Sequence, residues 1–174
     1  MIAAQTPYGK SASAGDPAAR PLLLGWREWA ALPDIGLHLI KAKVDTGART
    51  STLHAFYVEP LRRGAAQSVR FGVHPLRGRL DVVVHGEAPL LERRRVCDSG
   101  GHREERCVIL TQLWIGGREW PIELTLTNRE TMLFRMLLGR SAIAGHALVD
   151  PQLSFVTGRP VRPGNAMGRT EARP

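Results

Sequence analysis

The chain has few cysteines, few aromatic residues and no long apolar run, and each shortage excludes a class of protein. Two Cys in 174 residues do not make the disulfide framework of a small secreted domain. No stretch of about 18 apolar residues is present, so no membrane-spanning helix is expected. Residues 1–20 lack the continuous apolar segment of a secretion signal. Together these absences predict a cytoplasmic protein without a membrane partner.

Positive charge is plentiful, but it does not follow the pattern of a nucleic-acid-binding protein. Lys and Arg number 24 against 16 Asp and Glu, which gives a net charge of +8. The Arg residues are spread along the chain, and the short cluster Arg93–Arg95 contains no aromatic residue. Nucleic-acid binders more often carry one basic stripe interleaved with aromatics. We therefore interpret the charge as solvated surface and expect no nucleic-acid partner.

Composition divides the chain into one domain and two tails. Residues 1–21 and 158–174 are small, polar and rich in Gly and Pro, so they are expected to be flexible. The domain between them, residues 22–157, is long enough to bury a hydrophobic core without disulfides or metal.

Within this domain the hydrophobic residues mostly recur with a period of two, which is the pattern of half-buried strands. The clearest case runs from Trp120 to Leu126, where apolar residues alternate with polar residues or Pro. Other strands are expected at 22–31, 37–44, 52–58, 68–74, 79–85, 90–97, 106–115 and 147–156. One short helix is expected, beginning near Arg140. Short strands separated by Gly and Pro predict an all-β barrel or sandwich.

Two motifs that suggest nucleotide or metal chemistry are weak in their context. Residues 4–11 resemble a P-loop ending in Gly-Lys-Ser, but only three residues precede them and Ala4 replaces the first Gly. The spacing Cys97-x4-His102-x4-Cys107 offers three soft ligands, yet it matches no strong zinc pattern, and the chain has no His-Glu-x-x-His. The preferred interpretation includes no metal and no other cofactor.

The strongest chemical signal is Asp45-Thr46-Gly47-Ala48, which follows an apolar segment. The backbone N–H groups of such a turn can hold the carboxylate in one orientation. Gly47 lets the chain turn sharply and leaves space beside the carboxylate, and Thr46 offers a hydroxyl that braces the site. An isolated Asp-Thr-Gly is also ordinary turn chemistry, so the rest of the chain decides its meaning.

A second motif, late in the chain, supplies that context. Met136–Arg140 is an apolar strand that ends in Gly-Arg and leads into the expected helix. Together with Asp-Thr-Gly-Ala in a β chain, it resembles the retropepsin-like aspartic peptidases. The resemblance implies a closed barrel, a catalytic Asp45 and supporting roles for Thr46, Gly47, Ala48 and Arg140. It also implies a glycine-tipped flap hairpin that contacts substrate through Ser99, Gly100, Gly101 and His102.

A narrower resemblance covers residues from about 24 to 157. The stretches Gly25–Trp29, Lys41–Ser51, Ser99–Arg106 and Met136–Arg140 are similar to a bacterial family catalogued as ATP-dependent zinc proteases. Members of that family are associated with ATP-grasp ligases that add amino acids to proteins or peptides. The resemblance therefore implies a functional association with such a ligase. The residues themselves carry an aspartic signature and neither a credible nucleotide site nor a zinc-protease motif.

The chain departs from the retroviral pattern in two places. In retroviral members an acid follows Asp-Thr-Gly-Ala and pairs with the late Arg. Here that position is Arg49, so Arg140 is expected to have another partner. Residues 55–95 are also longer than in a minimal retropepsin, and we expect them to add strands or to reshape the cleft.

Aspartic proteolysis needs two carboxylates about 3 Å apart that share one proton. One activates water as a general base, and the other donates a proton to the scissile carbonyl. The chain has one convincing motif, so the second Asp45 is expected from a second chain in a C2 homodimer. Asp98-Ser99-Gly100 offers an internal alternative, but no apolar strand follows it and Leu-Gly-Arg occurs once.

Three functions remain open on these grounds. The leading hypothesis is a homodimeric aspartic endopeptidase that acts on peptides or proteins. The second is a zinc-dependent peptidase that uses Cys97, His102, Cys107 or histidines elsewhere in the chain. The third is a non-catalytic, peptide-binding module with the same fold.

Overall fold

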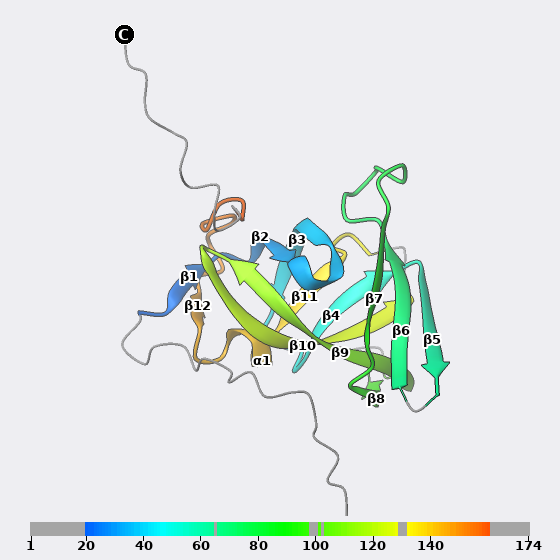
Figure 1. Ribbon diagram of the computed structural model, residues 1–174. Helices are drawn as coiled ribbons and strands as arrows, with labels where there is room; N and C mark the ends of the chain where they lie inside the picture. Colours follow the sequence, from blue (N-terminus) through cyan, green and yellow to red (C-terminus); the bar gives the residue numbers. More distant parts are fainter. Residues whose placement is uncertain (1–19, 65, 98–100, 102, 129–131, 161–174) are drawn as a thin grey trace, which may run out of the picture.

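The computed structural model describes residues 20–160 except 65, 98–100, 102 and 129–131 (Figure 1). A closed six-stranded barrel forms its centre, with the strands in the order β10-β4-β11-β3-β2-β9 and the ring completed by pairing of β9 with β10. The barrel strands are β2 (Arg27–Leu32), β3 (Leu37–Asp45), β4 (Ser51–Ala55), β9 (Arg103–Ile115), β10 (Arg118–Asn128) and β11 (Met136–Gly139). The all-β prediction is confirmed.

Smaller elements flank the barrel on opposite sides (Figure 1). On one side a two-stranded parallel sheet joins β1 (Leu22–Leu24) to β12 (Ala147–Val149). On the other, β5 (Tyr57–Arg63), β6 (Ala66–Val73) and β7 (Val84–Pro89) form an antiparallel sheet. The only helices among the described residues are α1 (Arg140–Ile143), where a short helix was expected, and the 3-10 turn η1 (Pro33–Ile35).

The core follows from the alternation of side chains along the barrel strands. On β10, Ile122, Leu124 and Leu126 point inward and are at most 4% exposed. Leu53 of β4 and Met136 of β11 meet them and are fully buried. Successive residues of a strand point to opposite faces, so the residues between these leucines lie on the outside of the barrel.

Two of the predicted strands are shorter in the structure, one at its start and one at its end. The strand expected at 79–85 begins at Val84, because residues 79–82 close a tight turn held by an Arg79–Asp81 ion pair and a hydrogen bond from the N–H of Val82 to the carbonyl of Arg79 (3.3 Å). The strand expected at 147–156 ends at Val149.

The segment after Val149 is held by a side chain instead of a strand ladder. The buried carboxylate of Glu28 accepts hydrogen bonds from the N–H groups of Val156 (3.0 Å) and Thr157 (3.2 Å), and from the Thr157 hydroxyl (2.9 Å). It also accepts one from the N–H of Gly25 (2.7 Å). A pattern of apolar residues cannot reveal such a contact, since the backbone groups are satisfied without a neighbouring strand.

The predicted strand 22–31 is interrupted at Gly25, where another part of the chain crosses. A Cβ at Gly25 would lie 2.3 Å from the carbonyl oxygen of Leu153. The N–H of Trp26 donates to the same carbonyl at 2.9 Å. This crossing separates β1 from β2.

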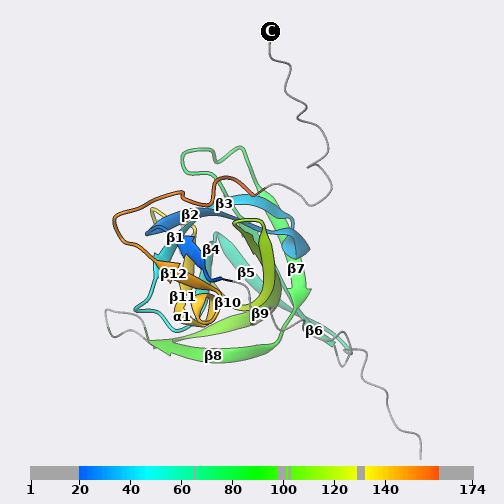
Figure 2. The same ribbon diagram turned by 90° about the vertical axis from the view of Figure 1, so that its left-hand side faces the viewer.

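The predicted flap corresponds to the hairpin of β8 (Glu92–Cys97) and β9, which pair in antiparallel register. Figure 2 shows β8 running along the outside of the barrel. Ser99, Gly100 and His102 lie outside the described residues. Gly101 is exposed and has a φ of 82°, which suits glycine at a tight turn. No helix in the described part of the chain is long and apolar enough to cross a membrane.

Candidate active site

Asp45 is the last residue of β3, and its position is fixed by neighbours on both sides. β11 runs parallel to β3 and places Gly139 directly beside Asp45 and Leu138 beside Val44. On the other side, the N–H of Val44 donates to the carbonyl of Trp26 at 2.9 Å. Val44 is buried and Asp45 is half-buried, so a core strand delivers a carboxylate to the surface.

The turn after β3 holds one oxygen of the carboxylate. Oδ1 of Asp45 accepts hydrogen bonds from the N–H groups of Gly47 (3.0 Å) and Ala48 (3.2 Å). Oδ2 accepts none from the residues that the structure describes. A Cβ at Gly47 would lie 3.2 Å from Oδ1, a tight contact. The turn therefore orients the carboxylate through its backbone and leaves one oxygen for other partners.

Arg140 binds backbone carbonyl groups of the Asp45 turn, in place of the acidic side chain that Arg49 replaces. Its Nη1 donates to the carbonyl oxygens of Thr46 (2.7 Å) and Gly47 (2.9 Å). Its backbone N–H donates to the carbonyl of Ala48 at 2.9 Å. One residue of α1 thus clamps three successive peptide groups of the Asp45 turn. Thr46 contributes its backbone carbonyl to this clamp.

Gly139 allows the late strand to approach the turn closely. A Cβ at this position would lie 2.5 Å from the carbonyl carbon of Thr50 and 2.9 Å from the carbonyl oxygen of Arg49. Its N–H donates to the hydroxyl of Ser51 at 3.1 Å, inside the protein. Ser51 is fully buried. The Leu-Gly-Arg motif therefore needs glycine for space, and Ser51 satisfies the glycine N–H.

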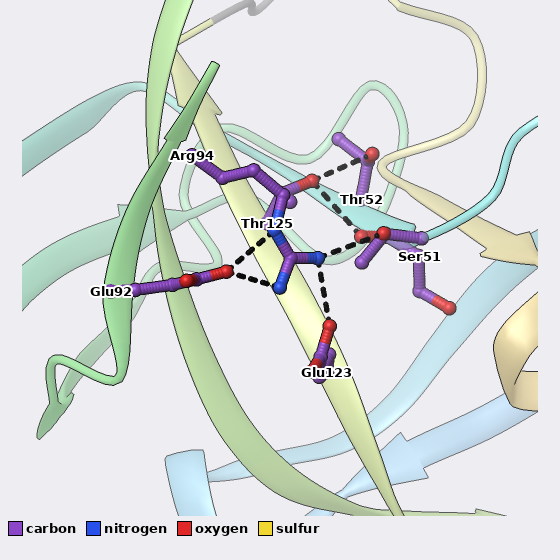
Figure 3. Close-up of polar contacts among 7 residues, drawn as sticks. Ser51, Thr52, Glu92, Arg94, Glu123 and Thr125 are labelled. Atoms are coloured by element: carbon purple, nitrogen blue, oxygen red, sulfur yellow. Dashed lines mark hydrogen bonds and ion pairs between the residues drawn. The ribbon is translucent and has the colours of Figure 1, made fainter. Parts of the chain in front are cut away.

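A buried hydroxyl network continues from Ser51 (Figure 3). The Thr125 hydroxyl lies 3.0 Å from the carbonyl of Ser51, to which it donates, and 2.9 Å from the Thr52 hydroxyl. Since Thr125 has a single hydroxyl proton, Thr52 must donate in the second contact. Thr52 and Thr125 are 6% and 1% exposed. The network fixes β4, which follows the Asp45 turn, to β10.

The two cysteines of the zinc hypothesis lie far apart on the β8–β9 ladder, and His102 lies outside the described residues. Cys97 pairs with Arg103 at one end of the β8–β9 ladder, whereas Cys107 pairs with Arg93. Four residues of strand separate the two positions, about 13 Å at 3.3 Å per residue. Burial raises the pKa of the Cys107 thiol, which disfavours a thiolate. In the described residues no group of three or more His, Cys, Asp or Glu could hold a metal ion.

Two residues of this region make contacts that no sequence pattern indicates. Ser51 stands in the run after Asp-Thr-Gly-Ala, but nothing in its spacing indicates that its hydroxyl accepts the Gly139 N–H from the neighbouring strand β11. Arg94 of β8 was treated as solvated surface, yet it reaches the hydroxyl of Thr50 at 3.1 Å. Both contacts join segments that are distant in sequence, so no local pattern carries them.

The closed barrel and the aspartate turn clamped by Arg140, the first residue of α1, define the fold of the chain as retropepsin-like. The motifs predicted this fold. The family described as "RimB-like: Retropepsin-like aspartic endopeptidase RimB" matches residues 23–160, and the chain belongs to that family.

The curated relatives are longer proteins. The chain is 50% identical over 139 residues to a protein of Parasynechococcus marenigrum named probable alpha-L-glutamate ligase, covering 80% of this chain and 30% of that protein. A protein of Shewanella pealeana with the same name is 43% identical over 136 residues, again over 30% of its length. The chain thus spans about a third of these relatives.

A solved structure has the same fold over almost its entire length. The crystal structure of Lpg0085, a protein of unknown function from Legionella pneumophila, is similar with a TM-score of 0.65 and 31% sequence identity. The similarity covers 78% of this chain and 98% of that one.

Proposed function

We propose that the protein is an aspartic endopeptidase whose catalytic dyad consists of Asp45 from each of two chains. The observation that carries this proposal is the Asp45 turn: a carboxylate at the end of a buried strand, held at Oδ1 by two N–H groups and clamped from behind by Arg140. Membership of a family described as retropepsin-like aspartic endopeptidases supports the same chemistry.

The proposed reaction is the hydrolysis of a peptide bond without a covalent intermediate. One carboxylate of the dyad removes a proton from water, whose oxygen attacks the scissile carbonyl carbon. The other carboxyl, which holds the shared proton, donates it to the carbonyl oxygen. Collapse of the tetrahedral intermediate breaks the C–N bond: the amine leaves with the proton taken from water, and the second carboxylate recovers its proton from a hydroxyl of the intermediate. The orienting N–H groups of Gly47 and Ala48 keep each carboxylate in position.

The need for a homodimer follows from the motif count. Asp-Thr-Gly-Ala and Leu-Gly-Arg each occur once in the sequence. A twofold axis beside Asp45 would bring two equivalent carboxylates together. The half-buried position of Asp45 at the barrel end is compatible with such an axis.

For the substrate, we propose a peptide or protein segment that carries glutamate. The relatives are named as alpha-L-glutamate ligases, and the net charge of +8 favours acidic substrates electrostatically. The chain would then act in the cytoplasm in association with an ATP-grasp ligase, on the products that the ligase makes.

The test is cleavage of a diverse peptide pool by wild type and Asp45→Asn, from pH 4 to 8, with excess chelator. We expect cleavage by wild type that survives chelation and is absent in the variant. Cleavage abolished by the chelator would instead favour the zinc hypothesis. An intact fold that binds peptides without any turnover dependent on Asp45 would favour the binding module.

A further inference from the structure

The outer face of β4 and β10 is polar, and β8 covers part of it through Arg94. Leu53 and Leu124 point into the core, so Thr52 and Thr125 point to the other face, where they lie opposite each other in register. Glu123, two residues before Thr125, lies on that same face. Hydroxyl and carboxylate groups thus line the outer face of the barrel along β10 and the start of β4, the strand that follows the Asp45 turn.

Arg94 of β8 extends over this face (Figure 3). Its guanidinium donates to Glu123 at 2.7 Å, to Glu92 at 2.6 Å and to the hydroxyl of Thr50 at 3.1 Å. Thr50 precedes Ser51, which accepts the N–H of Gly139 beside Asp45. A short chain of contacts therefore connects Arg94 to the candidate catalytic turn.

A cleft opens at the same hairpin as Arg94. In the β8–β9 ladder Arg94 is directly opposite Arg106. Arg106 lines a cleft of about 260 Å³, together with Glu104 and Thr127 among others. The cleft lies at the same hairpin, and Arg94 adjoins two of its lining residues, Arg93 in sequence and Arg106 across the ladder.

The present partners of Arg94 are replaceable. The side chain of Arg94 is 29% exposed, and those of Glu92 and Glu123 are 47% and 42% exposed. Ion pairs with this much exposure contribute little net stability, because water solvates the separated charges well. Glu123 can turn toward solvent, and a carboxylate from another molecule can take its place. Hydrogen bonding to Glu123 raises the pKa of Arg94, which stays cationic.

We propose that Arg94 is a specificity-determining residue that binds an acidic side chain of the substrate, and that Glu123 occupies this position when no substrate is bound. The proposal rests on the proposed function, which it deepens by naming the residue that recognises glutamate. The bidentate geometry of a guanidinium matches a carboxylate. Thr50 supplies a hydroxyl beside the guanidinium, since it accepts from Arg94 and keeps its own proton to donate.

Binding and turnover should be measured separately, so that a failure of this proposal is distinguishable from a failure of the peptidase assignment. The probes are a fluorescein-labelled glutamate-rich peptide and the same peptide with glutamine in place of each glutamate. Anisotropy in the Asp45→Asn background gives affinity without cleavage, and kcat/KM is measured in the Asp45 background. Arg94→Gln, Arg94→Lys and Glu123→Gln are compared, after circular dichroism confirms that each folds.

Arg70→Gln is the matched control, because Arg70 forms a partly exposed ion pair with Glu87 on the separate β6–β7 ladder. It removes the same unit of positive charge without touching the polar face. Any loss of peptide affinity that Arg70→Gln shares with Arg94→Gln comes from the lower net charge of the protein and not from recognition by Arg94.

The two members of the ion pair should respond in opposite directions. Arg94→Gln should weaken binding of the glutamate peptide by about 10- to 100-fold, the size of a charged hydrogen bond, and the glutamine peptide by less than about threefold. Glu123→Gln should strengthen glutamate binding, and Arg94→Lys should retain part of it. Equal losses for Arg94→Gln and Glu123→Gln on both peptides would overturn the proposal and make the pair a structural latch. No effect of Arg94→Gln beyond that of Arg70→Gln would overturn it as well.

Discussion

Replacing Gly139 with alanine should displace the Asp45 turn, and the structure sets the size of the effect. A Cβ there would lie 2.5 Å from the Thr50 carbonyl carbon, whereas ordinary contact begins at 3.4 Å. The backbone must therefore move by about 0.9 Å, and overpacking of this kind costs about 1–3 kcal/mol. At about 2–4 °C per kcal/mol for a domain of this size, the melting temperature should fall by roughly 2–12 °C. A misplacement of about 1 Å at a catalytic group lowers the rate by about 100-fold.

The assay pairs thermal melting with kcat/KM on a peptide that wild type cleaves. Gly117→Ala is the control, because it has no atom within 4 Å of the new Cβ and a φ of 73°. The left-handed conformation costs alanine about 1 kcal/mol, so this variant should melt lower yet keep activity within about twofold. A Gly139→Ala variant that melts and cleaves like wild type would contradict the close approach at Gly139. Activity losses in proportion to stability in both variants would contradict a specific effect on the Asp45 turn.

Three further changes test other parts of the structure. Arg140→Gln removes the clamp on the Asp45 turn and should lower kcat/KM more than tenfold. Because the Arg140 side chain is exposed, the loss of stability should be only about 1 kcal/mol. An unaltered kcat/KM would contradict the clamp. Glu28→Gln places an NH2 group against backbone donors and should lower the free energy of unfolding by about 2–3 kcal/mol in a denaturant titration. At pH 8, iodoacetamide should label exposed Cys97 first, since Cys107 is buried and burial raises its pKa; equal labelling rates by mass spectrometry would contradict this difference.

Local patterns predicted the parts of the fold that depend on neighbours in sequence. The alternation from Trp120 to Leu126 gave β10 and its inward face, and the Gly-Arg after an apolar strand gave the start of α1 at Arg140. The motifs also placed Asp45 at the end of a strand. These features need only a period of two and the chemistry of turns.

The remaining features depend on contacts between distant segments. The strand predicted at 147–156 ends at Val149, and the side chain of Glu28 satisfies the N–H of Val156 in place of a neighbouring strand. Ser51 and Arg94 gain their roles only when the barrel closes and β8 folds across β10. Such contacts arise from tertiary structure, so composition and periodicity along the chain do not determine them.

Subunit mixing tests the shared Asp45 dyad most directly. Wild type and inactive Asp45→Asn are combined in equal amounts under conditions where dimers exchange, and cleavage is compared with the same amount of wild type alone. Only dimers with two wild-type chains carry both carboxylates, so random C2 pairing predicts a fall to about half of the original activity. Further excess of the variant should drive activity toward zero. Activity that stays constant at every ratio would contradict a catalytic site built from Asp45 of two chains.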